Sequence, residues 1–438
     1  MAAPTLRRTL TLGDLIVYGL LFIGPLAPVG VFGVLDARTG GAVALVYLLA
    51  TLAMAFTAWS YAEMSGVVPQ AGSVFAYATQ GIGRPAGFLA GWLAMLDYLL
   101  IPSVACVFSG IALHALAPAV PAWAFTAAAF LLTTALNLAG VRLAARVGLY
   151  VLVVEIAVLA VFVLLSAAVL ALEGPARPWA SPFTGIGGVH LPAVIGAISV
   201  AVMSYLGFDA IASFAEESTG SSRQVGRAIL FCLAVAGALF VLQTWLASLL
   251  SAMDPRDLAA HPERQGTVFY DVVRAGIAPW LATLLSVTKG VGPAFSAMTA
   301  QAAAARLLFG MARDGRLPRA LARVDTRHGV PWVALVATAA LTLAVSVWAA
   351  RRADGLDLLV SVVDVGALAA FTLLHASVIG FFVVRRKGPA RAVHYGLPVA
   401  GALVTLWVIA EASALAQAVG AGWALAGLVV YGLQRRRA

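Results

Sequence analysis

Long runs of apolar residues divide the chain, and short polar segments separate them. A helix needs about 20 predominantly apolar residues to cross a bilayer, because it rises about 1.5 Å per residue. The runs near this length lie at residues 13–35, 42–65, 85–113, 119–140, 148–172, 192–213, 228–251, 279–303, 332–350, 357–384, 395–414 and 418–434. The pattern predicts an all-α integral membrane protein with about twelve transmembrane helices.

Two of these runs contain residues that interrupt a helix. The first run contains Gly24-Pro25-Leu26-Ala27-Pro28, and a proline lacks the N–H that a helix interior needs. The sixth run contains Tyr205-Leu206-Gly207-Phe208-Asp209, in which the glycine loosens the helix. Discontinuous helices at corresponding places in two halves of a chain indicate an inverted repeat with a binding site at mid-membrane. The alternative is that these residues serve only as kinks and packing positions.

Composition limits the classes of function. Hydrophobic residues make up 62% of the 438 residues and charged residues 11%, against about 25% charged residues in a soluble domain. Lipid must therefore solvate much of the surface. Cys106 and Cys232 lie inside apolar runs, so we predict buried thiols and neither a disulfide nor a metal site. We predict no cofactor, and the sequence leaves the oligomeric state open.

The placement of basic residues explains the formal net charge of +9. With the N-terminus in the cytoplasm, 20 of the 28 basic residues fall in inner segments and 7 in outer ones, while Lys289 lies inside a span. Lys and Arg favour short cytoplasmic loops. We therefore predict a multi-pass protein of the cytoplasmic membrane with both termini in the cytoplasm. The same placement argues against a nucleic-acid partner.

Several motifs spread along the chain resemble one transporter family. Residues 61–64 read YAEM and residues 69–73 read PQAGS, like an inner loop after a second helix. Residues 205–209 read YLGFD, and residues 305–318 read ARLLFGMARDGRLP, with GVP following at 329–331. Together these stretches resemble the amino acid–polyamine–organocation (APC) superfamily of permeases. Leu96-Asp97-Tyr98 with Pro102, and Ala300-Gln301-Ala302, are most similar to its putrescine-importer branch.

The resemblance implies a LeuT-like fold and transport by alternating access. A five-plus-five inverted repeat would have discontinuous helices 1 and 6, followed by two accessory helices. On this chain the whole of residues 1–438 forms one transporter domain, with a first repeat at 13–172, an inverted second repeat at 192–384 and the accessory helices at 395–434.

Ionisable residues within the spans are candidates for function, because a charge inside a bilayer is costly. Asp209 follows the break in the sixth span, where it either contacts a substrate ammonium or caps the second half of the helix. Asp97, near the middle of the third span, either contacts the substrate or pairs with Lys289. Asp364 is placed nearer the outer vestibule. The predicted substrate-binding residues are Gly24, Leu26, Ala27, Asp97, Tyr205, Gly207, Phe208 and Asp209.

Glu155 and Lys289 are the predicted proton-coupling residues. By the resemblance, Glu155 falls where several proton-coupled relatives place a lysine, which stands in for a sodium ion. Burial disfavours the charged form of a carboxylate, so Glu155 is suited to load and release a proton near neutral pH. The alternatives are a static Glu155–Lys289 bridge, or a Lys289 that binds a substrate carboxylate. Ser286 and Ser296 leave sodium possible.

The candidate residues favour an amine over a carboxylate. Pro25 and Pro28 remove backbone N–H groups that would hold a carboxylate at the first break. The buried acids suit an ammonium, to which Phe208 would add a cation–π contact. We therefore predict a proton-coupled symporter of putrescine, another polyamine or another organic cation. The alternative is an amino acid permease or exchanger of the same superfamily, because Lys289 favours a zwitterion.

Other classes of membrane protein fit less well. The six histidines are scattered and form no spacing typical of a metal or nucleophile site, so an enzyme is not predicted. A channel would usually show a pore loop or a ring of charges. A receptor would need a sizeable soluble domain, and the segments between spans are short.

Overall fold

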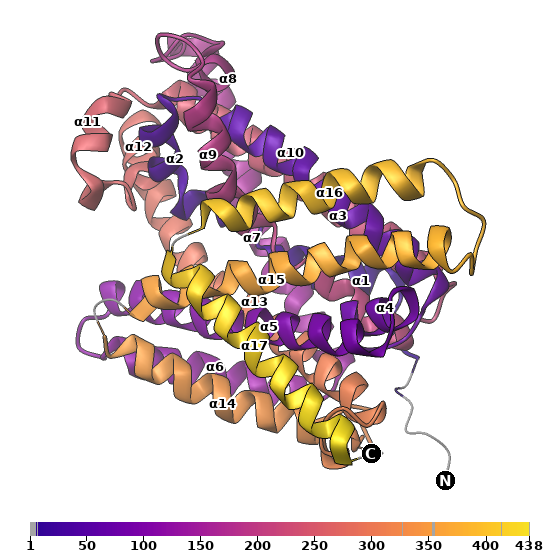
Figure 1. Ribbon diagram of the computed structural model, residues 1–438. Coiled ribbons are helices and arrows are strands. Elements are labelled where there is room, and N and C mark those ends of the chain that lie inside the picture. The colour runs from indigo at the N-terminus through magenta and orange to yellow at the C-terminus, as the bar shows by residue number, and fades with distance from the viewer. Residues whose placement is uncertain (1–5, 7, 326, 353–354, 413, 438) are drawn as a thin grey trace.

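A computed structural model describes residues 6, 8–325, 327–352, 355–412 and 414–437. Within these residues the regular elements are helical, apart from an isolated bridge between Leu10 and Ser218. The α-helices are α1 (Leu12–Ile23), α2 (Phe32–Thr39), α3 (Val43–Val67), α4 (Val74–Gly81), α5 (Arg84–Leu116), α6 (Ala122–Leu138), α7 (Val141–Glu173), α8 (Ser181–Thr184), α9 (Leu191–Val202), α10 (Arg223–Leu250), α11 (Pro255–Ala260), α12 (Val268–Gly276), α13 (Pro279–Arg313), α14 (Trp332–Ala350), α15 (Gly355–Val378), α16 (Val393–Glu411) and α17 (Ala414–Arg437). Figure 1 shows a bundle of long helices, with the short helices α2, α8, α11 and α12 gathered at one end and the short helix α4 at the other.

The membrane-spanning helices follow the apolar runs. Ten helical segments of the described chain are long and apolar enough to cross a bilayer, and α6 is a shorter apolar helix. The 35-residue α13 is also long enough to cross, and it extends past the apolar run into the polar motif that ends at Arg313. The prediction of an all-α membrane protein is thereby confirmed.

The long helices α5 and α13 form the centre of the bundle. They pack along each other, and α5 also contacts α6, α14, α15 and α17. The last helix, α17, docks through a reciprocal pair of tryptophans. Trp92 donates to the Trp423 carbonyl at 2.9 Å, Trp423 donates to the Trp92 carbonyl at 2.7 Å, and the two rings stack. This contact ties the end of the chain to the central helix α5.

The helix formed by α1 and α2 is interrupted where the sequence predicts it. Helix α1 ends at Gly24, whose φ of 75° lies in the left-handed region that glycine tolerates. A 3₁₀ turn over Ala27–Gly30 then leads into α2.

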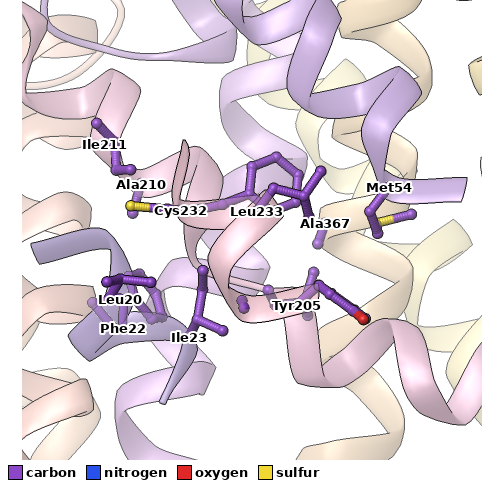
Figure 2. Packing of buried hydrophobic residues seen from close by; sticks show 14 of the residues in the cluster. Leu20, Phe22, Ile23, Met54, Tyr205, Ala210, Ile211, Cys232, Leu233 and Ala367 are labelled. Carbon is purple, nitrogen blue, oxygen red and sulfur yellow. The ribbon is translucent and has the colours of Figure 1, made fainter. Parts of the chain in front are cut away.

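The second interruption lies after α9. A short 3₁₀ turn over Met203–Tyr205 precedes Gly207 (φ 121°), and a 3₁₀ helix over Phe208–Glu217 follows. A Cβ at Gly207 would lie 2.7 Å from the ring of Phe22, so the two interruptions pack directly against each other. Figure 2 shows Phe22 and Ile23 of the first interruption in the same apolar cluster as Tyr205 and Ile211 of the second.

Neighbouring helices donate hydrogen bonds to backbone carbonyls at the first interruption. Gln243 of α10 donates to the Pro25 carbonyl at 3.0 Å, and Ser296 of α13 donates to the Phe22 carbonyl at 2.6 Å. Buried backbone groups need such partners where a helix no longer supplies them. Hydrogen bonds from α10 and α13 therefore stabilise the interrupted conformation.

Two buried ion pairs lie at opposite ends of the bundle. We call them the Asp36–Arg177 clamp and the Glu217–Arg306 clamp. Arg177 binds both carboxylate oxygens of Asp36 at 2.7 and 2.8 Å and also donates to the Met253 carbonyl. Arg306 binds both oxygens of Glu217 and lies over the ring of Phe214.

The Glu217–Arg306 clamp lies at the end where the described chain begins and finishes. The backbone N–H groups of Thr9 and Leu10 donate to the Glu217 carbonyl at 2.9 Å. Near the other terminus, Gln434 donates to the carbonyl of Arg316, just beyond α13. Both ends of the described chain are thereby attached to one end of the bundle.

Candidate substrate site

A cavity of about 190 Å³ lies at the two helix interruptions. Its wall comes from the interruptions themselves and from α5, α13 and α15, and most of its lining is apolar. The lining includes Phe22, Ala27, Phe108, Ser204, Leu206, Lys289 and Val363. Because it lies where two interrupted helices meet within the bundle, this cavity is the candidate substrate site.

Lys289 is the charged residue of the cavity wall. Its Nζ lies 5.4 Å from the centroid of the Phe108 ring, within the range of a cation–π contact. In the part of the chain that the structure describes, this ammonium forms no hydrogen bond and no ion pair. The lysine predicted to couple protons therefore faces the place where a solute would bind.

The residues predicted at the interruptions take different positions. Ala27 lines the cavity, whereas Gly24 forms the turn and the Leu26 side chain is buried. The hydroxyl of Tyr205 points towards α3, where it donates to the Tyr47 carbonyl at 3.1 Å.

Phe208 lies in the protein interior beyond the second interruption. Its ring is fully buried, and it packs against Tyr61 and Phe371. Gly207 is the residue of the second interruption against which the Phe22 ring packs. The structure therefore places Ala27 at the cavity surface and gives Tyr205, Gly207 and Phe208 supporting positions.

Three carboxylates lie together beside the cavity, and we call Asp97, Asp209 and Asp364 the acidic cluster. Asp209 accepts hydrogen bonds from the Tyr98 hydroxyl at 2.6 Å and from the Gly207 N–H at 3.2 Å. Asp97 is close enough to the other two for the charges to interact. One oxygen of Asp97 and one of Asp364 are buried without a hydrogen-bond partner. Within the described residues no basic side chain forms an ion pair with the cluster.

The acidic cluster adjoins the cavity along three elements. Three residues of the cavity lining lie close in sequence to the three acids. Ile101 lies one helical turn beyond Asp97 on α5, Leu206 lies three residues before Asp209, and Val363 directly precedes Asp364. The sequence-based placement of Asp364 near an outer vestibule is therefore corrected. The sequence indicated that Asp364 is an acid within a span. No sequence pattern indicates that α15 brings Asp364 near Asp97 of α5.

Glu155 of α7 and Lys289 of α13 are near each other without touching. Their charges interact, but no nitrogen–oxygen distance is 4.0 Å or less. The carboxylate of Glu155 packs where a side chain of Gly292 would otherwise lie, and its Oε2 has no hydrogen-bond partner. The static bridge considered from the sequence is not formed in this structure.

The two serines that left sodium possible are both engaged. Ser286 donates to the Ala282 carbonyl of its own helix at 2.9 Å, and Ser296 donates to the Phe22 carbonyl. Among the residues that the structure describes, no group of three or more His, Cys, Asp or Glu is arranged to hold a metal ion.

Comparison with known proteins finds similarity along nearly the whole chain. The family model described as "Amino acid permease" matches residues 10–430. The low-affinity putrescine importer PlaP of Escherichia coli (strain K12) is 31% identical over 438 residues, which cover 97% of this chain and 93% of the importer. The branched-chain amino acid permease BcaP and the methylthioribose transporter of Bacillus subtilis (strain 168) are each 28% identical, covering 99% of this chain and 94% and 95% of their own lengths.

Proposed function

The chain belongs to the amino acid permease family, and from that premise we propose that it imports putrescine or a similar small organic cation by proton-coupled secondary transport. Membership of this family makes the protein a membrane transporter of amine-containing solutes and not an enzyme. The identity of the solute, the coupling ion and the alternating-access mechanism are the proposed parts.

The acidic cluster carries the proposal for an organic cation. Carboxylates buried without a basic partner are costly, and they bind an ammonium through charge-assisted hydrogen bonds. Asp97, Asp209 and Asp364 supply these acceptors beside a cavity that a small diamine can enter. The similarity to a putrescine importer over 97% of the chain supports the same solute class.

Alternating access would use the two halves of the proposed repeat. We assign residues 13–172 to the first repeat, 192–384 to the second and 395–434 to the accessory helices. We also propose that the end holding Glu217 and Arg306 faces the cytoplasm of the cell. The attachment of both ends of the described chain to that end supports this orientation, together with the excess of basic residues in the same segments.

Proton coupling would depend on Glu155. This carboxylate has an oxygen without a hydrogen-bond partner and lies within reach of the charge of Lys289. A carboxylate in these surroundings changes its interaction with Lys289 when it binds a proton. The proton state of Glu155 would thereby be communicated to the cavity wall.

Uptake of radiolabelled putrescine into proteoliposomes tests the function. We expect accumulation that increases when an inwardly directed proton gradient is imposed, and we expect unlabelled spermidine or putrescine to compete. Liposomes without protein provide the control. Absence of putrescine flux, with or without a gradient, would contradict the proposal.

An amino acid is the second candidate solute, and Lys289 is the observation that favours it. An ammonium in the cavity wall without an ion pair offers a partner for a carboxylate. The similarity to the branched-chain amino acid permease BcaP is consistent with such a solute. Competition by leucine but not by diamines, in the same uptake assay, would select this candidate.

A further inference from the structure

The ammonium of Lys289 lies over an aromatic ring in the wall of the cavity. Its Nζ lies over the ring of Phe108, and both residues belong to the wall of the same cavity. Within the described part of the chain, this ammonium has no hydrogen bond or ion pair that would otherwise explain its position. An aromatic face attracts an ammonium through its quadrupole, and the attraction grows when water is excluded. The Phe108 ring is therefore a cation-binding surface that the protein fills with its own lysine.

A second place for the same ammonium lies beside Glu155. The Oε2 atom of Glu155 is buried without a partner, and its charge already interacts with Lys289. Gly292, one turn along α13 from Lys289, leaves the space that the carboxylate occupies. On the other side, a Cβ at Gly30 would lie 3.9 Å from the Lys289 Cε, which is an ordinary van der Waals distance. Lysine has a flexible four-carbon stem, so its ammonium can move between neighbouring partners.

We propose that Phe108 holds one ammonium of the transported diamine while the acidic cluster attracts the other, and that Lys289 occupies the position over Phe108 only until the diamine arrives. Two cations cannot share one ring face, because like charges repel strongly where water is excluded. An incoming ammonium therefore displaces Lys289 towards Glu155, where the two opposite charges pair. Lys289 is a built-in competitor that lowers the affinity for amines. This inference rests on the proposed function, since it requires an amine as the solute.

Binding of radiolabelled putrescine to the purified full-length chain tests the proposal. Phe108→Leu keeps an apolar wall but removes the ring, and it should weaken putrescine binding by roughly two- to thirtyfold. Phe108→Tyr keeps the ring and should bind like the unmodified protein. Lys289→Met removes the competing ammonium and should tighten binding about fivefold or more. In the Phe108→Leu background, the same Lys289→Met change should tighten binding less.

A matched control lies on the same helix but outside the cavity wall. Ile111→Val removes one methyl group from a side chain that is 45% exposed and does not line the cavity, and it should leave the dissociation constant for putrescine unchanged. The elution profile and thermal unfolding of every variant establish that it is folded.

Two results would overturn the inference. Unchanged affinity in folded Phe108→Leu would show that the ring does not hold the amine. Weaker amine binding in Lys289→Met would show that Lys289 helps to bind the solute instead of competing with it. If the unmodified protein neither binds nor transports any amine, the proposed function fails as well. If it transports putrescine and the Phe108 variants bind normally, only the inference about Phe108 and Lys289 fails.

Discussion

At the residue scale, Asp97 is a buried acid without a basic partner among the described residues. Its side chain is 2% exposed, yet one carboxylate oxygen accepts no hydrogen bond and no basic side chain of the described chain neutralises it. Such a group destabilises the folded state and is usually kept for function. The sequence alone identified Asp97 as an intramembrane acid, but the paired alternative with Lys289 could be set aside only after the helices were placed.

Asp97→Asn should separate function from stability. Loss of the negative charge should weaken putrescine binding about tenfold or more, because a hydrogen bond to a charged group contributes about 1.5–3 kcal/mol. Thermal stability should stay the same or increase, since no cation is left unpaired. Equilibrium binding and thermal unfolding measure the two effects. Asp271→Asn, the same change in an exposed pair with Arg274, is the control. A destabilised Asp97→Asn protein with normal affinity would assign Asp97 a structural role.

Glu155→Gln should remove the response to a proton gradient. The variant keeps the shape of the side chain but cannot lose a proton, so uptake should no longer increase when the outside is acidified. Exchange of internal for external putrescine should persist, because exchange needs no net proton movement. Both are measured in proteoliposomes. Glu173→Gln, at the exposed end of the same helix α7, should respond like the unmodified protein. Retention of full gradient-driven uptake by Glu155→Gln would rule out its coupling role.

At the scale of elements, local chemistry made the helix interruptions predictable. Proline and glycine change backbone conformation wherever they occur, so residues 24–28 and 205–209 indicated the breaks that the structure contains. Contacts between helices were not predictable in this way. The Asp97–Asp364 neighbourhood depends on how α5 packs against α15, and the direction of the Phe208 ring depends on Tyr61 and Phe371. Apolar runs contain no information on which helices become neighbours.

The bond from α13 to the first interruption can be tested with two serines of one helix. Ser296→Ala removes the donor to the Phe22 carbonyl and should cost about 1–3 kcal/mol, because a buried carbonyl loses its partner. Ser286→Ala removes a hydroxyl that bonds only within its own helix, and it should change stability by about 0.5 kcal/mol or less. Thermal unfolding in detergent compares the two. Equal effects would show that Ser296 does not hold the break.

At the scale of the whole molecule, the number and apolar character of the long helices could be read from the sequence, whereas the two clamps could not. Each clamp joins residues far apart in the chain: Asp36 with Arg177, and Glu217 with Arg306. Arg306 counts among the basic residues of inner segments and Arg177 among those of outer segments, and neither position signals a buried ion pair in the sequence. In the structure both ion pairs are formed at once, one at each end of the bundle.

Opening of the Glu217–Arg306 end can be followed with a native thiol. Arg306→Met leaves Glu217 buried without its partner, which should destabilise the closed end by about 3–5 kcal/mol. Cys232 lies against α1, with its Sγ 3.6 Å from the Ile16 carbonyl, and Figure 2 shows it beside Leu20 and Ile211. Movement of α1 should therefore increase the rate at which a maleimide labels Cys232.

Cys106 supplies the internal control for that experiment. It is buried in a separate cluster with Phe130 and Ala297, away from α1. Its labelling should stay slow in both proteins. Unchanged labelling of Cys232 in Arg306→Met would show that the ion pair does not keep this end closed.

The two clamps also have a consequence for the electrical state of the membrane. Each buries an arginine, 4% and 3% exposed, together with the carboxylate that neutralises it, so neither pair presents an unpaired charge. A stray proton or metal cation that crossed the protein would have to give up its hydration shell beside groups whose hydrogen bonds are already made, which is costly away from water. We expect the empty carrier to act as an insulator, so that an energised cell can keep many copies in its membrane without draining its ion gradients.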